Sequence, residues 1–199
     1  MIAKIALIAL LLQVCVANNA AIEFLSSPGC TDQELASPSC KWYSSCLQSA
    51  FNCPADSYPL GYGNKYCTRF TEALDMFTPM GKSWIMKTMV CLKKALGPYA
   101  KAMDQTGKGV TCDQLTDIAF DSHPTCYVES GFCQLFKEQD FADMTKTCKA
   151  LWHVFDMKDL FQARGVKQIS ATLKTCQLGF TTYFKLMAAC GAGFFTYSR

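Results

Sequence analysis

The chain has 199 residues, half of them hydrophobic, and a formal net charge of +3 at pH 7. This length fits a single domain with a sizeable core, and so small a charge gives no reason to expect a nucleic-acid partner. The unusual feature of the composition is its 13 cysteines, a content typical of secreted proteins that are held together by disulfides.

The first residues predict a secretory signal peptide. Lys4 supplies a positive charge, residues 5–16 are almost continuously apolar, and small residues follow at a position suited to signal peptidase. The apolar run is too short to span a bilayer comfortably, and an uncleaved N-terminal anchor is the alternative. We therefore expect residues 1–17 to be a signal peptide and residues 18–199 to form a single disulfide-rich helical domain, secreted and without a membrane span.

Loss of the signal peptide leaves twelve cysteines, and this even number predicts a disulfide framework. They are Cys30, Cys40, Cys46, Cys53, Cys67, Cys91, Cys112, Cys126, Cys133, Cys148, Cys176 and Cys190. No two of them are spaced as C-x-x-C, the arrangement of many zinc sites and of thioredoxin-like redox sites. We therefore expect structural disulfides and neither a metal site nor a cofactor.

The segment before Cys67 is rich in proline, glycine and serine, which predicts turns. Its YPLGYGN stretch lacks the third glycine of a phosphate-binding loop. Helical spacing of apolar residues begins after Cys67, with a first break at Pro79 and a second helix that we expect to stop at Gly97-Pro98. Thr111 and Gln114 resemble a capping box that opens a third helix.

Two further helices are expected toward the C-terminus. Asp140 is a candidate N-cap for a helix that reaches residue 155, and Gly191 is a candidate terminator of a last, longest helix. The inward-facing apolar stripe expected for this last helix is Val166, Ile169, Leu173, Cys176, Phe180, Phe184 and Met187. No segment alternates with a period of two, so the sequence predicts an all-α fold: a disulfide-stapled helical bundle with a turn-rich N-terminal segment.

Groups for catalysis or metal binding are sparse. His123 and His153 are the only histidines, and neither has a local partner suited to acid–base catalysis or metal binding. Asp113, Asp117 and Asp121 share a helical face, but a straight face offers too few ligands for calcium, which favours a solvated face. We therefore expect no catalytic residue, no cofactor-binding residue and no enzymatic activity.

One stretch is basic. It holds Lys82, Lys87, Lys93, Lys94, Lys101 and Lys108, opposed only by Asp104. We interpret these lysines first as a solvated helix face. The alternative is a face that meets acidic glycans or an acidic protein surface.

Two stretches have a distinctive cysteine spacing: a step of 24 residues in CTRFTEALDMFTPMGKSWIMKTMVC, and steps of 14 and 7 residues in CDQLTDIAFDSHPTCYVESGFC. They also contain the pairs Gly81-Lys82 and Cys126-Tyr127. With these features, the cysteine spacing from residue 30 to residue 133 resembles that of the stanniocalcins, a family of secreted, disulfide-linked dimeric hormones. About half of the chain is covered.

The resemblance implies a disulfide pairing and a function. The implied pairs are Cys30–Cys46, Cys40–Cys67, Cys53–Cys112, Cys91–Cys126, and Cys133 with Cys148 or Cys176. The late cysteines either pair within the chain or supply one bridge in a homodimer. The implied function is that of a hormone or regulatory factor that binds an extracellular protein or receptor, with a link to calcium and phosphate balance. The alternatives are a structural protein of an extracellular matrix or reproductive fluid, and a helical carrier of a small apolar ligand.

Overall fold

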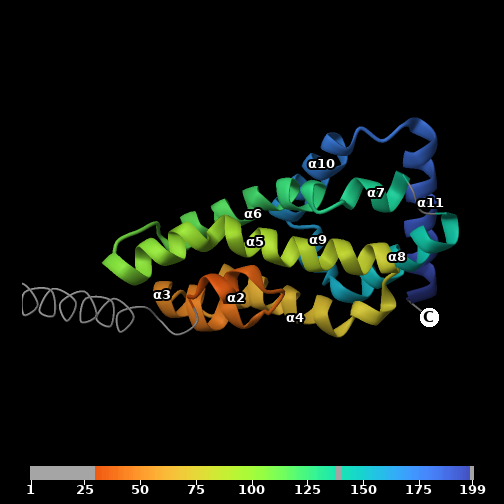
Figure 1. Cartoon of the computed structure of the whole chain (residues 1–199). Helices are drawn as coiled ribbons and strands as arrows, with labels where there is room; N and C mark the ends of the chain where they lie inside the picture. Colours follow the sequence, from red (N-terminus) through yellow and green to blue (C-terminus); the bar gives the residue numbers. More distant parts are fainter. Residues whose placement is uncertain (1–29, 138–139, 198–199) are drawn as a thin grey trace, which may run out of the picture.

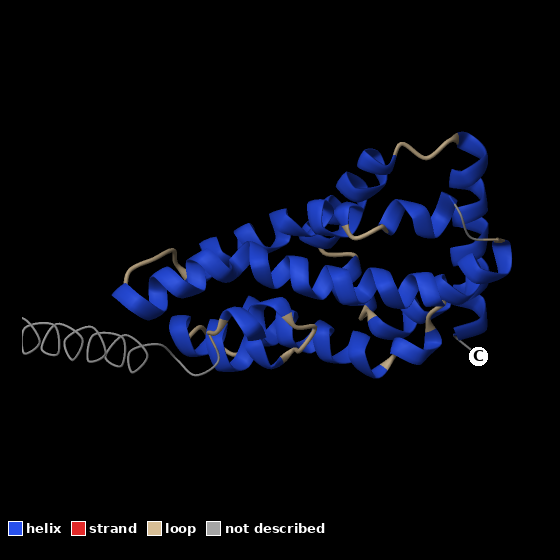
Figure 2. Cartoon of the chain, in the orientation of Figure 1, coloured by secondary structure: helices blue, strands red, loops and turns tan. Residues whose placement is uncertain are grey.

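A computed structural model describes residues 30–137 and 140–197, with side chains up to residue 191; the expected signal peptide lies outside this part of the chain. The regular structure within these ranges is helical, without strands, which confirms the expected all-α fold (Figure 2). The helices are α2 (Asp32–Ala36), η1 (Tyr43–Gln48), α3 (Ser49–Phe51), η2 (Tyr58–Asn64), α4 (Lys65–Glu72), η3 (Leu74–Met76), α5 (Pro79–Thr106), α6 (Cys112–Glu129), α7 (Phe132–Lys137), α8 (Phe141–Val154), α9 (Met157–Leu160), α10 (Ala163–Cys176) and α11 (Phe180–Tyr197).

The long helices α5 and α6 form an antiparallel pair at the centre of the molecule (Figure 1). The N-terminal segments from α2 to α4 lie along one side of α5, and α10 packs on α6. Helices α8 and α11 pack on each other at the end of the molecule opposite the α5–α6 turn. The hydrophobic core runs between these layers and includes the fully buried side chains of Trp42, Phe77, Leu96, Leu115 and Leu135.

The N-terminal segment contains more helix than its composition predicts. Turns occur on either side of the η1–α3 unit, but YPLGYGN forms the π-helical η2 and is not a turn. Its glycines allow close packing: a Cβ at Gly61 would lie 2.4 Å from the Asp56 carbonyl oxygen, and one at Gly63 would lie 2.6 Å from the ring of Tyr43. Gly63 is therefore required by a tertiary contact, and Gly61 by the close approach of the turn just before η2.

Helix α5 passes through Gly97-Pro98, so the expected stop is wrong. The proline costs the helix one backbone hydrogen bond and about 3 kcal/mol, but Leu96 and Ala100 on either side of it are fully buried. Gly97 brings α5 close to α2, because a Cβ there would lie 2.9 Å from the Leu35 side chain. The helix ends nine residues later at Gly107, whose φ of 63° is the left-handed conformation that glycine adopts without strain.

The expected N-caps are confirmed. Thr111 accepts a hydrogen bond from the Gln114 backbone N–H, and the Gln114 side chain accepts one from the Thr111 N–H, which completes the capping box of α6. Asp140 accepts a hydrogen bond from the backbone N–H of Asp143 at the start of α8. Each cap uses residues three apart in the sequence, so no distant contact is needed to form it.

The prediction of a single C-terminal helix, the longest of the chain, is wrong. This region is divided into α10 and α11 at Gln177, whose positive φ of 45° ends α10. The Gln177 N–H bonds to the Lys174 carbonyl as α10 ends, and the chain resumes as helix at Phe180. Gly191 lies inside α11 and does not terminate it. The division changes the direction of the chain, so α11 packs on α8 while α10 packs on α6.

Candidate binding surface

Helix α10 buries small and uncharged polar residues and not its apolar stripe. Its buried residues are Gly165, Gln168, Thr172 and Cys176. The Gln168 side-chain amide donates to the Tyr127 hydroxyl at 2.7 Å, and the Thr172 hydroxyl donates to the Gln168 carbonyl at 2.8 Å. Gly165 lies so close to the α9 backbone that a Cβ would come within 2.5 Å of the Asp159 carbonyl oxygen. Small and hydrogen-bonded residues thus fill the interface that an apolar stripe was expected to fill.

Long-range bonds hold α10 in this orientation. Cys176 is bonded to Cys133 of α7. Arg164 Nη2 lies 2.7 Å from the Asp117 carboxylate, and Lys167 Nζ lies 3.0 Å from the Asp121 carboxylate. These ion pairs are more than half exposed, so each contributes between 0 and about 1 kcal/mol. The disulfide and the buried Gln168 are the stronger constraints on which side of α10 faces the core.

The stripe that the sequence predicted to be core is largely exposed. Val166 and Ile169 of α10 are 49% and 41% exposed, and Phe180 and Phe184 of α11 are 79% and 56% exposed. We call Val166, Ile169, Phe180, Tyr183, Phe184 and Met187 the α10–α11 apolar face. The prediction that this stripe faces inward is wrong except at Cys176, which is buried, and Leu173, which is half-buried against the core.

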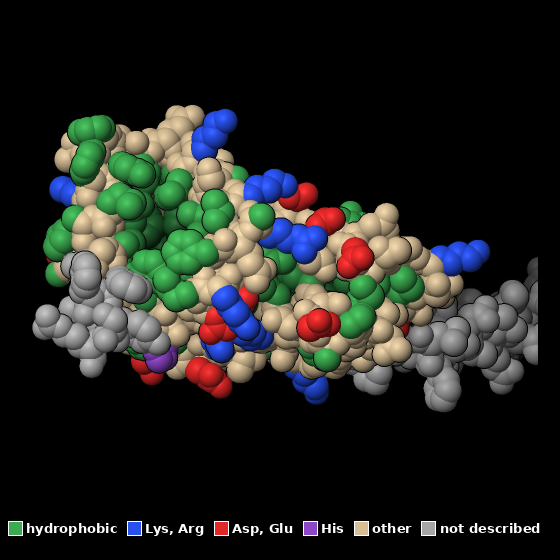
Figure 3. Space-filling view, turned by 180° about the vertical axis from the view of Figure 1, so that it is seen from behind, with side chains coloured by type: hydrophobic (Ala, Val, Ile, Leu, Met, Phe, Trp, Pro, Cys, Tyr) green, Lys and Arg blue, Asp and Glu red, His purple; other side chains and the backbone are tan. Residues whose placement is uncertain are grey.

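Figure 3 shows hydrophobic side chains gathered over a hollowed surface at the end of the molecule that holds α11. The rings of Phe180 and Phe184 contact each other with centroids 4.5 Å apart. On the opposite side of α11, Leu186 and Ala189 are buried. Cys190 is bonded to Cys148 of α8, and the Trp152 indole N–H donates to the Cys190 carbonyl at 2.9 Å. The helix is therefore attached through one side while its aromatic side faces solvent.

The chain segment that carries this face contains basic side chains but no acidic ones. From Leu160 to the end of the chain there is no Asp or Glu, but there are Arg164, Lys167, Lys174, Lys185 and Arg199. The first two are paired with α6 carboxylates, whereas Lys174 and Lys185 have no ion-pair partner among the described residues. Lys174 and Lys185 are therefore cations of these two helices that carboxylates on a binding partner could complement.

Six disulfides fix the framework that carries this surface. They join Cys30 to Cys46, Cys40 to Cys67, Cys53 to Cys112, Cys91 to Cys126, Cys133 to Cys176 and Cys148 to Cys190. The first four pairs are those that the stanniocalcin resemblance implies, and the partner of Cys133 is the second of its two alternatives. Every cysteine from Cys30 onward is paired within the chain, so none of them is left for an interchain bridge.

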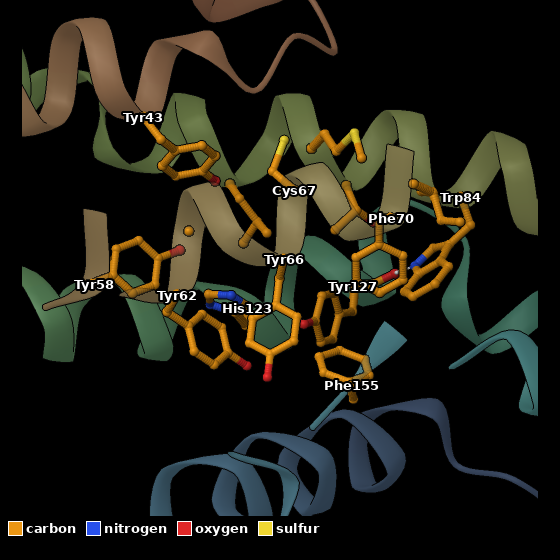
Figure 4. Close-up of a pocket in the computed structure, with 15 residues that line it drawn as sticks. Tyr43, Tyr58, Tyr62, Tyr66, Cys67, Phe70, Trp84, His123, Tyr127 and Phe155 are labelled. Atoms are coloured by element: carbon orange, nitrogen blue, oxygen red, sulfur yellow. Dashed lines mark hydrogen bonds between the residues drawn. The ribbon is translucent and has the colours of Figure 1, made fainter. Parts of the chain in front are cut away.

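A small cavity lies among aromatic residues of η1, η2, α4, α5 and α6 (Figure 4). Its volume is about 40 Å³, which is room for a few water molecules and far below the roughly 300 Å³ of a small-molecule pocket. Burial raises the pKa values of the Tyr43 and Tyr58 hydroxyls beside it. The cavity does not provide the space that an apolar-ligand carrier needs.

His123 borders the cavity as a buried, neutral side chain. Burial lowers its pKa to about 4, and its Nδ1–H donates to the Ala119 carbonyl at 2.6 Å. No carboxylate is among the residues that line the cavity, so none there could orient His123 as a general base. His153 lies exposed near the end of α8. Within the described ranges, no three His, Cys, Asp or Glu side chains are placed to hold a metal ion.

The structure also joins charged residues that are distant in the sequence. Lys65 Nζ lies 2.5 Å from the Asp156 carboxylate and 2.8 Å from that of Asp159, and Arg69 Nη1 lies 2.8 Å from Asp156. Hydrogen bonds from Lys65 and Arg69 lower the pKa of Asp156 to about 2. The Tyr66 hydroxyl donates to Asp159 at 2.5 Å. This cluster ties α4 to α9, and because its members lie about 90 residues apart, no local sequence signal predicts it.

Asp113, Asp117 and Asp121 are exposed, as expected for a solvated face, and two of them also form ion pairs with α10. The interpretation of the basic stretch needs one correction. Lys93 is fully buried and does not belong to a basic surface. Its Nζ donates to the carbonyls of Glu34, Ser37 and Ser39 and so fastens the N-terminal segment to α5. Burial lowers the pKa of Lys93 to about 8.

Searches of protein-family models, of curated proteins and of solved structures found no match to the chain. No helix in the described ranges is both long and apolar enough to cross a membrane. The structure therefore describes a disulfide-rich, all-helical protein whose most unusual surface is the α10–α11 apolar face.

Proposed function

We propose that this chain is a secreted, stanniocalcin-like regulatory factor that acts by binding an extracellular protein through the α10–α11 apolar face. The observation that supports the proposal most directly is the exposure of this face on a framework fixed by disulfides. Contiguous exposed apolar surface is typical of interaction sites. Aromatic side chains such as Phe180, Tyr183 and Phe184 are enriched at the centres of protein interfaces.

The attachment of the two helices suits a binding role. Cys133–Cys176 holds α10 and Cys148–Cys190 holds α11, so the face is already ordered before a partner arrives. Ordering of flexible segments is one of the costs of association, and a preformed face avoids much of it. The same disulfides support an extracellular location, because such bonds persist in oxidising environments.

The charge pattern favours a different protein over a second copy of the chain. A symmetric dimer through this face would bring Lys174 and Lys185 of one copy toward those of the other, since no Asp or Glu follows Leu160 to offset them. Like charges placed opposite one another disfavour a complex, whereas an acidic rim on the partner would favour it. With all cysteines from Cys30 onward paired internally, the proposal contains no interchain disulfide. Electrophoresis without reductant should show a monomer.

The regulatory role rests on the stanniocalcin resemblance of the cysteine ladder. Four of the disulfides agree with the pairing that this resemblance implies. The proposed link to calcium and phosphate balance rests on the same resemblance. A carrier of a small apolar ligand is less favoured, because the enclosed cavity holds only about 40 Å³. No feature of the surface specifically favours a structural matrix protein.

The proposal can be tested with labelled full-length protein purified from culture medium. We expect saturable binding to the surface of a responsive cell type, and we expect Phe180→Ser with Phe184→Ser to weaken it by at least about 30-fold, the loss of one interface hot spot. The control is Met157→Ser, which removes an apolar side chain of 41% exposure on α9. Calcium and phosphate uptake is measured on the same cells.

Each result has a clear meaning. Loss of binding in the double variant but not in the control supports the face as the binding site. Equal binding by all three proteins would exclude it. Unsaturable deposition of the wild type would instead indicate the structural matrix role, and an unchanged ion uptake despite saturable binding would contradict the proposed physiological link.

A further inference from the structure

Three lysines form a straight ladder along α5. Lys87, Lys94 and Lys101 are seven residues apart, so successive members are about 10.5 Å apart along the axis and rotate by only about 20°. All three side chains are exposed. The ladder therefore presents three ammonium groups on one side of the helix over a length of about 21 Å.

The ladder borders an open groove of about 480 Å³. The groove is lined by Pro38, Met86, Lys87, Val90, Cys91 and Lys94. No carboxylate is among these residues, and none within the described ranges lies at ion-pair distance from Lys87 or Lys94. A cleft lined by charge of one sign concentrates ligands of the opposite sign.

Other cations near the groove are already occupied. Lys93 is buried and bonded to carbonyls, and Lys82 lies 2.5 Å from the Asp75 carboxylate. On the other side of the molecule, Arg164 and Lys167 are paired with α6 carboxylates. The one acidic residue of α5 is Asp104, which lies near the end of the helix, three residues after Lys101 and ten after Lys94. The positive charge of Lys87 and Lys94 is therefore not neutralised by neighbouring residues of their own helix.

We propose that this ladder and groove bind a sulfated glycosaminoglycan chain. Such a polymer is linear, extracellular and regularly anionic, which matches a straight row of evenly spaced cations. The groove is open and its apolar floor is limited to short stretches around Met86 and Val90, so it lacks the deep apolar pocket that anchors a peptide. Sugar rings lie against such a floor while sulfates reach Lys87 and Lys94. The site is separate from the α10–α11 apolar face and does not depend on the function proposed for it.

The test is binding of the full secreted chain to immobilised heparin, measured by affinity and by the NaCl concentration of elution. We expect Lys87→Gln, Lys94→Gln and Lys101→Gln together to weaken binding at least about tenfold, or about 1.4 kcal/mol. The control carries the same charge change at the exposed Lys146, Lys149 and Lys158. Circular dichroism verifies that every variant is folded.

Two further arms identify the ligand chemistry. Arginine at all three ladder positions should retain binding, and desulfated heparin should fail to compete. An unchanged affinity of the ladder variant, or an equal loss in the control variant, would overturn the proposal. Competition by polyglutamate as effective as that by heparin would also overturn it, because the groove would then recognise an acidic protein surface.

Discussion

The inverted orientation of α10 leads to a prediction that contradicts ordinary hydrophobic patterning. Gln168 is polar but 6% exposed, and Val166 is apolar but 49% exposed. Both lie within α10 and both can be replaced by alanine. If the orientation is right, Gln168→Ala should destabilise the protein more than Val166→Ala.

The magnitudes follow from the contacts of each side chain. Gln168→Ala removes the hydrogen bond to the Tyr127 hydroxyl and leaves this buried hydroxyl without that partner, which costs about 1–3 kcal/mol. It also removes one buried methylene, worth about 0.8 kcal/mol. A gain in helix propensity of about 0.5 kcal/mol offsets part of this, so we expect a net loss of about 2 kcal/mol. For Val166→Ala, the loss of half-buried apolar surface is similar to the gain in helix propensity, so the stability should change by less than about 0.5 kcal/mol.

Thermal unfolding followed by circular dichroism measures the difference. A loss of about 2 kcal/mol in a domain of this size should lower Tm by about 4–8 °C, whereas Val166→Ala should leave Tm nearly unchanged. A double-mutant cycle of Gln168→Ala with Tyr127→Phe should show a coupling of about 1 kcal/mol. If Val166→Ala were the more damaging change, α10 would bury its apolar stripe and the α10–α11 apolar face would not exist.

Three further predictions concern the framework. Lys93→Met should lower the free energy of unfolding by about 2–4 kcal/mol, because three carbonyls lose a charged donor. Lys94→Met on the exposed side should change it by less than about 0.5 kcal/mol. Chemical denaturation measures both values, and equal losses would contradict the buried hydrogen bonds of Lys93. Asp156 has a folded pKa of about 2, below its ordinary value of 3.8, so its contribution to folding stability is complete above pH 3.8 and is lost as pH falls through 2. The difference in Tm between wild type and Asp156→Asn should disappear across this pH window. A difference independent of pH would show that the Asp156 carboxylate does not stabilise the fold through its ion pairs. Cys53→Ser or Cys112→Ser removes a disulfide that spans 59 residues and contributes about 4 kcal/mol of stability in the chain-entropy description. Either variant should therefore sharply reduce the amount of protein secreted into the culture medium. Normal secretion would show that the disulfide is dispensable.

Much of the secondary structure was predictable because its signals are local. The caps at Thr111 and Asp140 depend on residues three positions away, and the helical spacing of apolar residues after Cys67 needs only the chain itself. The even number of cysteines likewise predicted a disulfide framework. The pairs among the first eight cysteines agree with those implied by family resemblance, but the partners of Cys148 and Cys190 were left open.

Two sequence predictions were wrong because contacts with distant residues decide the outcome. Gly97-Pro98 has the composition of a helix stop, yet burial around it and the approach of Leu35 keep α5 helical. Lys93 belongs by sequence to a basic stretch, but the folding of residues 34–39 over α5 surrounds its ammonium group with carbonyl oxygens. In both cases the residue that makes the decisive contact is more than 50 positions away in the sequence. The periodicity of apolar residues gives no information about contacts at that distance.

The amino-acid sequence by itself determined that the chain is helical, cysteine-bonded and amphipathic along its C-terminal region, because these properties follow from neighbouring residues. Only the tertiary structure decided which side of α10 and α11 faces the core. Periodicity identifies two sides of a helix but not the surface that each meets. That choice was made by the disulfides of Cys176 and Cys190 and by the Gln168–Tyr127 hydrogen bond, which bury the small and polar side and leave the aromatic side available for binding.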